Sequence, residues 1–198
     1  MKRLLQMIFL VASLPLSAEA AVVEWKVADG GNGHAYELVT DQLAWPDART
    51  AATLRNGPPG FGTGHLATIS NIAENQFLVD NFAVLTPFGF YMGFTDELVE
   101  GEWHWVDATP GIWQDPDNFL NPIQTAYTNW APSEPNDLGG EDYGILRGGT
   151  ATDWNDGQIT PPGPYVVEWS PVPEPSALLL AGVGLWGVYV ARRFGRQI

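Results

Sequence analysis

Two apolar segments, one near each end of the chain, limit which residues can fold into a globular domain. At the N-terminus, residues 4–16 are almost entirely apolar, follow Lys2 and Arg3, and lead into Ala18-Glu19-Ala20. A basic start, an apolar stretch and a small-x-small site in this order are typical of a secretory signal peptide. Residues 1–20 are therefore predicted to be a signal peptide rather than a buried N-terminal helix.

The second apolar segment, residues 176–191, lies between a proline-containing linker and three arginines, Arg192, Arg193 and Arg196. The prolines of Pro173-Glu174-Pro175 break any preceding helix. Residues 176–191 would span roughly 24 Å as a helix, somewhat less than the ~30 Å hydrocarbon core of a bilayer. Arginines stay on the cytoplasmic side, so the domain before them would lie outside. The segment is predicted to be a short transmembrane anchor.

The order Pro-Glu-Pro, apolar helix and arginine cluster also resembles the PEP-CTERM sorting signal of Gram-negative bacteria that produce exopolysaccharide. The resemblance covers residues 171–198. It implies that an exosortase-type membrane enzyme acts near Pro173, Glu174 and Pro175. The chain would then be exported, anchored transiently in the inner membrane by its C-terminal helix, and finally secreted or held at the cell surface.

Without the two ends, the remaining residues carry a more negative net charge than the whole chain. The whole chain has nine basic and 23 acidic residues, for a net charge of −14. Residues 21–170 keep four of the basic residues and 21 of the acidic ones, so their net charge is near −17. This charge argues against nucleic acid or an anionic surface as the main partner. The chain has no cysteine, which excludes disulfides and cysteine-ligated zinc.

The 150 residues between the ends are enough for two or three layers around one core. Residues 45–54 are predicted to be helical, with Pro46 in the first turn, and Asn71 followed by Glu74 predicts the start of a second helix. A long loop is expected over residues 109–136. Short strands are predicted at residues 22–25, 35–39, 65–69, 90–94, 102–106 and 165–169. This order indicates an α+β fold without βαβ repeats.

Oxygen-bearing side chains are densest in residues 129–137, and more follow at Glu141-Asp142 and Trp154-Asn155-Asp156. Carboxylate and amide oxygens are the ligands that Ca²⁺ collects six to eight at a time. A cis Glu134-Pro135 bond would let the Glu134 and Asn136 side chains point at one ion. The residues alone leave a second interpretation open, in which the segment is an acidic, solvated turn.

Across residues 33–169 the sequence resembles the C-type lectin-like domain. The resemblance is carried, in the family's order, by residues 36–39 with 43–48, 64–69 with 74–75, 91–96, 101–107, Glu134-Pro135-Asn136 and Trp154-Asn155-Asp156. It implies an α+β fold in which two helices flank short antiparallel sheets and a long loop binds calcium. Residues 21–170 are accordingly predicted to be a C-type lectin-like domain.

The resemblance also implies a site. Calcium would be held by Glu134, Asn136, Glu141, Asn155 and Asp156, and the same residues would bind two vicinal hydroxyls of a sugar. The Glu-Pro-Asn order resembles that of members which favour mannose, glucose or N-acetylglucosamine. Exopolysaccharide or cell-surface glycans would be the carbohydrate partners, and an accessory calcium would lie near Asp137 and Asp142.

Three departures from the family limit the transfer. Tyr143 stands where a cysteine is common, so the family's disulfides, each worth about 2–4 kcal/mol, cannot form. Residues 112–125 look like an insertion. Its Asp115, Asp117 and Asn118 would reshape the sugar site or ligate an extra ion, and its Trp113 could stack on a sugar. The spacing between Glu134 and Glu141 also differs from that of sugar-binding members.

Two other functions compete with carbohydrate binding. The domain could be a structural or adhesive matrix module in which calcium only stabilises the long loop. It could also be a glycoside hydrolase that uses Glu134 and Glu141 as paired acids. Metal ligation would keep both carboxylates ionised and leave no proton donor, so the sequence predicts a protein that is not an enzyme. The three histidines are scattered and predict no zinc or catalytic site.

Overall fold

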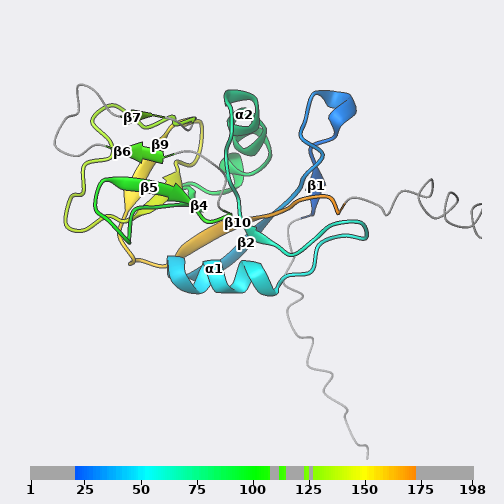
Figure 1. Ribbon diagram of the computed structural model, residues 1–198, viewed down its shortest axis with the longest axis horizontal. Helices are drawn as coiled ribbons and strands as arrows, with labels where there is room; N and C mark the ends of the chain where they lie inside the picture. The colour runs from blue at the N-terminus through cyan, green and yellow to red at the C-terminus, as the bar shows by residue number, and fades with distance from the viewer. Residues whose placement is uncertain (1–20, 108–111, 115–122, 125–126, 173–198) are drawn as a thin grey trace, which may run out of the picture.

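A twisted sheet runs through the molecule in the computed structural model, which describes residues 21–107, 112–114, 123–124 and 127–172 (Figure 1). Its main path has the strand order β1-β2-β10-β4-β5-β6-β7, with β3 beside β10 and β8 between β4 and β9. The strands are β1 (Val23–Glu24), β2 (Ala35–Leu43), β3 (His65–Leu66), β4 (Phe90–Thr95), β5 (Glu102–Trp105), β6 (Ile112–Gln114), β7 (Ile123–Gln124), β8 (Tyr143–Leu146), β9 (Trp154–Gly157) and β10 (Gly163–Trp169).

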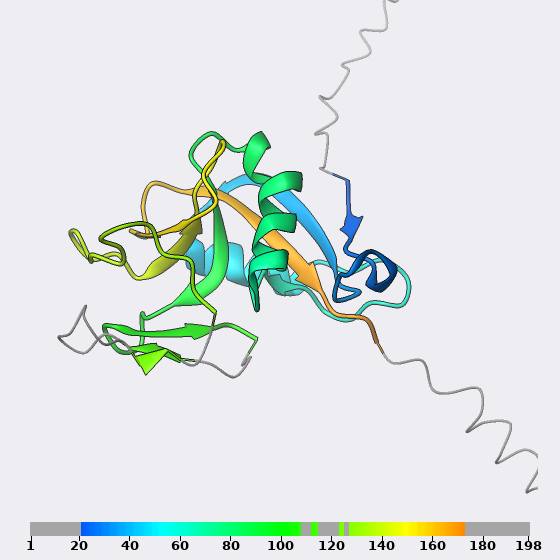
Figure 2. The same cartoon turned by 90° about the horizontal axis from the view of Figure 1, so that it is seen from above.

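Two helices, α1 (Trp45–Leu54) and α2 (Ile72–Asn81), cover opposite faces of this sheet (Figure 2). Helix α1 begins with Pro46 in its first turn, as predicted, and buries Ala48 and Ala52. Helix α2 is capped at its N-terminus by Asn71, whose side chain accepts hydrogen bonds from the backbone N–H groups of Ala73 and Glu74. Two 3₁₀ turns, Val27–Asp29 and Ala83–Leu85, complete the helical elements of the described residues.

Because both faces are covered, the central strands are buried along most of their length. All six residues of β4 are buried, and so are the first five of β2. A strand covered on both faces has little need of alternating polar residues. One core cluster packs against α1 through Trp45, and the other packs against α2 through Leu78 and Phe82. The predicted α+β class with two flanking helices is confirmed.

The structure refines the predicted strands in three ways. Strands β4 and β10 pair in parallel, so the sheet is not wholly antiparallel. The predicted loop over residues 109–136 contains β6 and β7, which extend the sheet beyond β5. Strands β8 and β9 were not predicted. In the case of β9, the sequence Trp-Asn-Asp-Gly contains turn-forming residues. Long-range pairing of β9 with β8 overrides that local preference.

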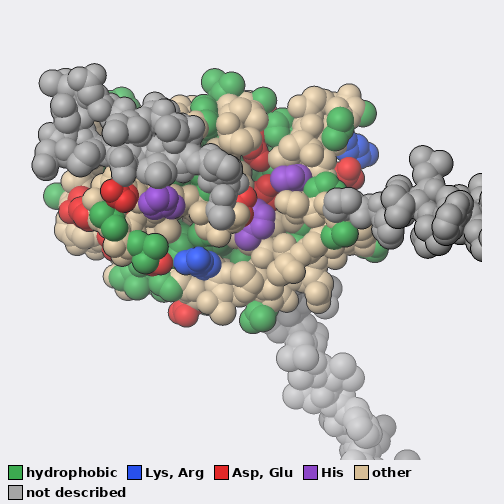
Figure 3. Space-filling view, viewed as in Figure 1, with side chains coloured by type: hydrophobic (Ala, Val, Ile, Leu, Met, Phe, Trp, Pro, Cys, Tyr) green, Lys and Arg blue, Asp and Glu red, His purple; other side chains and the backbone are tan. Residues whose placement is uncertain are grey.

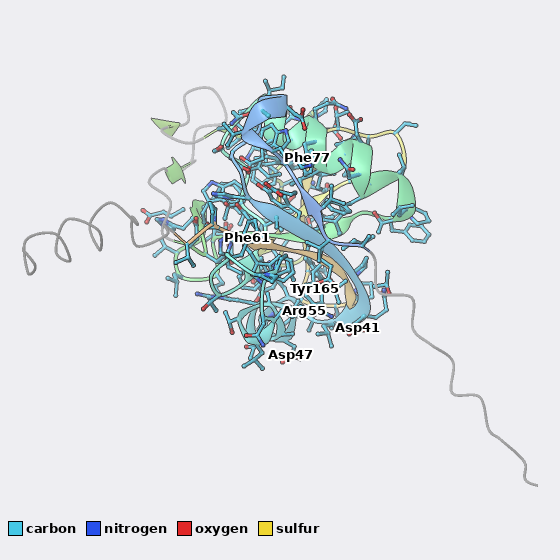
Figure 4. The ribbon with its side chains drawn as sticks, turned by 90° about the vertical axis from the view of Figure 1, so that its right-hand side faces the viewer. Asp41, Asp47, Arg55, Phe61, Phe77 and Tyr165 are labelled. Atoms are coloured by element: carbon cyan, nitrogen blue, oxygen red, sulfur yellow. The ribbon has the colours of Figure 1, made fainter. Side chains whose placement is uncertain are left out.

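Helix α1 is joined to β2 by a charged pair rather than by a disulfide. Arg55, just after α1, donates from Nη1 to both carboxylate oxygens of Glu37 at 3.1 and 3.0 Å. Arg55 and Tyr165 lie beside each other under the sheet (Figure 4). On the same side of the sheet, Tyr143 stacks on Trp45 with 4.8 Å between ring centroids. Aromatic packing and ionic contacts therefore link elements in a chain that has no cysteine.

Two buried carboxylates, Glu74 and Glu168, form a polar network between α2, β2 and β10. Glu168 is 1% exposed and accepts from the backbone N–H and the hydroxyl of Thr68, while His34 Nδ1 contacts its other oxygen. Glu74 accepts from the Tyr36 hydroxyl at 2.6 Å. The contact with Glu168 raises the pKa of His34, with smaller contributions from other nearby acids, and burial partly opposes the rise.

Both ends of the described chain emerge on the side of β1, away from β5, β6 and β9 (Figure 1). The predicted signal peptide and the Pro173-Glu174-Pro175 motif lie outside the described residues. So do Asp115, Asp117, Asn118 and the side chain of Trp113. Within the described ranges, no helix is long and apolar enough to cross a bilayer.

His34→Gln tests the pair between His34 and Glu168. A raised histidine pKa adds stability that is fully present below about pH 6.5 and is lost as the pH rises through the raised value. We expect the variant to lower the free energy of unfolding by roughly 1.5–3 kcal/mol near pH 5.5 and by much less near pH 9, in urea titrations. His104→Gln, outside this network, serves as the control. An equal loss at both pH values would contradict a protonated pair.

Candidate functional site

Strand β9 carries the predicted Trp154-Asn155-Asp156 motif. Because side chains alternate between the two faces of a strand, the three residues of the motif differ in their surroundings. Trp154 is fully buried, packs edge-on against Trp105 and Trp130, and donates from Nε1 to Asn75 Oδ1 at 2.6 Å. Asp156, two residues later, is also fully buried, while Asn155 between them is partly exposed. Burial of Trp154 therefore fixes where the two polar side chains lie.

The loop containing Glu134-Pro135-Asn136 is attached to β9 along its length. Trp154 exchanges backbone hydrogen bonds with the loop, donating to Asn129 and accepting from Ala131 at 2.9 and 2.8 Å. Further on, the Asp156 Oδ2 atom accepts from the backbone N–H groups of Asn136 and Asp137, both at 2.8 Å. The Glu134-Pro135 bond is cis, the isomer considered from the sequence. Asp156, which is buried, thus fixes the backbone of the loop at Asn136 and Asp137.

All five predicted site residues come together at this end of the molecule. The Asn136 amide donates to Glu134 Oε2, and the Asn155 amide donates to the Asp156 backbone carbonyl. The backbone N–H of Leu138 is shared between Asn136 Oδ1 at 2.9 Å and Glu141 Oε2 at 3.1 Å. Glu141 therefore joins the group despite its unusual spacing, because the loop folds back between Asn136 and Glu141.

The carboxylates of the site lie close together, and the hydrogen bonds within the site leave one of their oxygens without a partner. Burial raises the pKa of Glu134, and the neighbouring Asp156 raises it further. Burial also raises the pKa of Glu141, followed by the charge of Asp156. The Oδ1 atom of Asp156 is buried and has no hydrogen-bond partner. A buried carboxylate oxygen without a partner is costly, and a cation beside it would remove that cost.

The donor set fits a hard cation such as Ca²⁺ through carboxylate and amide oxygens together. Within the described part of the chain, no three His, Asp or Glu side chains form a group that could hold a metal ion by themselves. A cation held here would need amide oxygens, such as those of Asn136 and Asn155, in addition to carboxylate oxygens. The unpartnered oxygen of Asp156 is the feature that favours a cation here.

A second acidic group lies beside the first and includes residues that the sequence did not single out as ligands. Asp96, just after β4, is 2% exposed, its Oδ2 accepts from Gly101 N–H at 2.9 Å, and its Oδ1 has no partner. Burial raises the pKa of Asp96 to about 7, helped by Glu100 and Asp142. Burial likewise raises the pKa of Glu100, followed by Asp137 and Asp142. An acid directly after a mainly apolar strand was the available signal.

Family comparison agrees with this geometry. Residues 61–165 match the profile of the lectin C-type domain, which spans more than half of the chain. The chain belongs to the C-type lectin domain family. Residues 171–196 also match the PEP-CTERM protein-sorting motif.

Among curated relatives of this C-type lectin, the perlucin-like protein of Mytilus galloprovincialis is 30% identical over 47% of the chain and 53% of its own length. Human C-type lectin domain family 4 member K is 28% identical over 67% of the chain and 34% of its length. The chain thus spans about half or less of these relatives. The solved structure of lectin CEL-I from Cucumaria echinata aligns with a TM-score of 0.57 and 20% identity, covering 70% of this chain and 91% of that one.

C-type lectin domains are carbohydrate-binding modules rather than enzymes, and this lectin shares their fold. The glycoside hydrolase hypothesis, with Glu134 and Glu141 as its acids, is therefore set aside.

Asp156→Ala, measured in EDTA, tests the structural part of the site. The variant removes the acceptor of two backbone N–H groups, so we expect the free energy of unfolding to fall by roughly 1–3 kcal/mol in urea titrations. Asp153→Ala is the matched control, because Asp153 pairs with Arg147 at the surface. Loss of that pair should cost less than about 1 kcal/mol. Equal effects of the two substitutions would contradict a special role for Asp156.

Proposed function

We propose that this lectin binds sugar through a calcium ion held by Glu134, Asn136, Glu141, Asn155 and Asp156. The observation that supports the proposal most strongly is the buried Oδ1 atom of Asp156. This atom has no hydrogen-bond partner, and two other acids, Glu134 and Glu141, lie close to Asp156. Calcium, when bound, would supply positive charge to these oxygens and accept lone pairs from two vicinal hydroxyl oxygens of the sugar.

The protein's own groups would do the rest of the recognition. Carboxylate oxygens of Glu134 would accept a hydrogen bond from one sugar hydroxyl, and the amide N–H of Asn136 would donate to the oxygen of the same or the adjacent hydroxyl. The Asn136 amide now donates to Glu134, so both partners already face each other across the loop. Asp156 keeps that loop in place through its two backbone hydrogen bonds.

We propose a mannose-type specificity, for mannose, glucose or N-acetylglucosamine, from the Glu-Pro-Asn order. We also propose an accessory calcium position. After burial, Glu100 and Asp142 raise the pKa of Asp96, and Asp137 and Asp142 raise the pKa of Glu100; Asp96 also has a buried oxygen without a partner. A cation there would neutralise repulsion between the loop and the turn after β4.

Exopolysaccharide or cell-surface glycan is the proposed target. Residues 1–20 would direct export, residues 21–170 would bind the glycan, and residues 171–198 would be processed by an exosortase-type enzyme. Strand β9 lies at the end of the molecule away from both chain ends, so a tether at the C-terminus would leave the site open (Figure 1). Few basic side chains appear on the face shown in Figure 3, in keeping with an uncharged ligand.

A structural or adhesive function remains the second candidate, with one observation in its favour. Several site groups bind the loop itself, since Leu138 N–H donates to both Asn136 and Glu141. Calcium that only stabilised this loop would raise the melting temperature without creating a sugar site.

Glu134→Gln separates these candidates. The substitution keeps the size of the side chain but removes one charge and replaces one carboxylate oxygen with an NH2 group, so we expect calcium affinity to fall at least tenfold and retention on mannose resin to be lost. Glu24→Gln makes the same change on exposed β1 and should alter neither quantity. Calorimetric titration with calcium measures the affinity, and elution from mannose resin with EDTA measures the retention.

The adhesive function would be supported instead if calcium raised the melting temperature of the unsubstituted protein while no mannose-type sugar competed or bound. Absence of any calcium effect on the melting temperature would contradict both candidates, because a ligand at 100 times its Kd should add about 2.7 kcal/mol of stability.

A further inference from the structure

A hollow of about 620 Å³ opens beside the candidate sugar site and shares residues with it. Glu141, Asn155 and Asp156 line the hollow as well as the sugar site. From there it runs over the segment between α2 and β4 and the segment before β10. Its volume lies within the range of about 300–1,000 Å³ that is usual for preformed ligand pockets. One ligand could therefore contact the sugar site and the hollow at the same time.

The far part of this hollow is mainly apolar and partly open to solvent. Phe88 is 96% exposed and Leu85 is 61% exposed, although both line the hollow. Pro161 and Pro162 form part of the wall, and Ile145 also lines it. Exposed apolar residues that gather around one concave surface mark a binding region more often than scattered ones do.

The backbone around the hollow is fixed, so the hollow is preformed. Gly89, directly after Phe88, has a φ of +91°, and a Cβ atom there would lie 2.3 Å from the Leu146 carbonyl oxygen. Its N–H donates to the Thr86 carbonyl at 3.1 Å, closing the turn. Across the hollow, the Tyr91 hydroxyl lies 3.1 Å from the Pro161 carbonyl oxygen, to which it donates. Phe88 is therefore held outward by the turn rather than by contacts of its own ring.

The charge of the lining excludes one class of ligand. Among the described residues, the carboxyl groups that line the hollow are Glu141 and Asp156, and no lysine, arginine or histidine lines it. A phosphate, sulfate or carboxylate in the hollow would meet negative charge without a cation of the lining to bind it. An uncharged apolar group would gain about 0.8 kcal/mol for each methylene it buries, which corresponds to roughly fourfold in affinity.

We propose that this lectin binds an amphiphilic glycoconjugate, with the sugar at the calcium site and an uncharged apolar aglycone in the hollow. The inference rests on the proposed calcium-dependent sugar binding and specifies its ligand class. Continuity through Glu141, Asn155 and Asp156 would allow the glycosidic group to pass directly from the sugar site into the hollow.

Titration of the full-length protein with methyl α-D-mannopyranoside and n-octyl α-D-mannopyranoside, below the micelle concentration and with calcium, tests the inference. We expect the octyl glycoside to bind at least tenfold more tightly than the methyl glycoside, as burial of two methylenes would suffice. Phe88→Ala should reduce that ratio severalfold. Leu54→Ala is the control, because Leu54 is 76% exposed at the end of α1 and lies outside the hollow.

The outcomes distinguish this inference from the sugar-binding proposal beneath it. Calcium-dependent binding of both glycosides with equal affinity would overturn the apolar aglycone and leave the sugar site intact. Binding of neither glycoside would overturn both. A gain for mannotriose that depends on Phe88, without a gain for the octyl glycoside, would assign the hollow to a sugar chain and overturn the apolar aglycone.

Discussion

Burial of Trp154 is the interaction on which both the core and the site depend. Its ring is fully buried among other aromatic side chains, and its indole N–H is satisfied by Asn75 of α2. Because side chains alternate along a strand, the same placement directs Asp156 into the interior two residues later. Asp156 then captures the backbone of Asn136 and Asp137. A hydrophobic contact thus sets the position of a polar loop.

The domain reaches a stable fold without cysteine by linking its elements through buried polar and aromatic groups. Arg55 pairs with Glu37 between α1 and β2, and Tyr143 stacks on Trp45 between β8 and α1. Glu74 and Glu168 are buried, yet each accepts several hydrogen bonds, so the cost of burying their charge is offset. A disulfide acts mainly by lowering the entropy of the unfolded chain, whereas these contacts stabilise the folded state, and some of them depend on pH.

Satisfied and unsatisfied carboxylates separate the structural acids from the candidate ligands. Glu168 lies in a network of donors, whereas Asp156 and Asp96 each keep one buried oxygen without a partner. Net negative charge alone does not identify a site, because much of it is solvated at the surface. The unpartnered oxygens do distinguish a small group of acids, and this group lies at the end of the molecule away from the chain ends (Figure 1).

The sequence by itself determined the family, the α+β class and both helix starts, and it predicted the five side chains of the candidate site. These follow from local signals, such as the Asn71 cap and the Glu-Pro-Asn and Trp-Asn-Asp motifs, and from their order. Only the tertiary structure brought Asp96 to the neighbouring acids, formed β9 from turn-forming residues, and built the hollow around Phe88. Each of these depends on contacts between distant segments, which residue type and spacing do not encode.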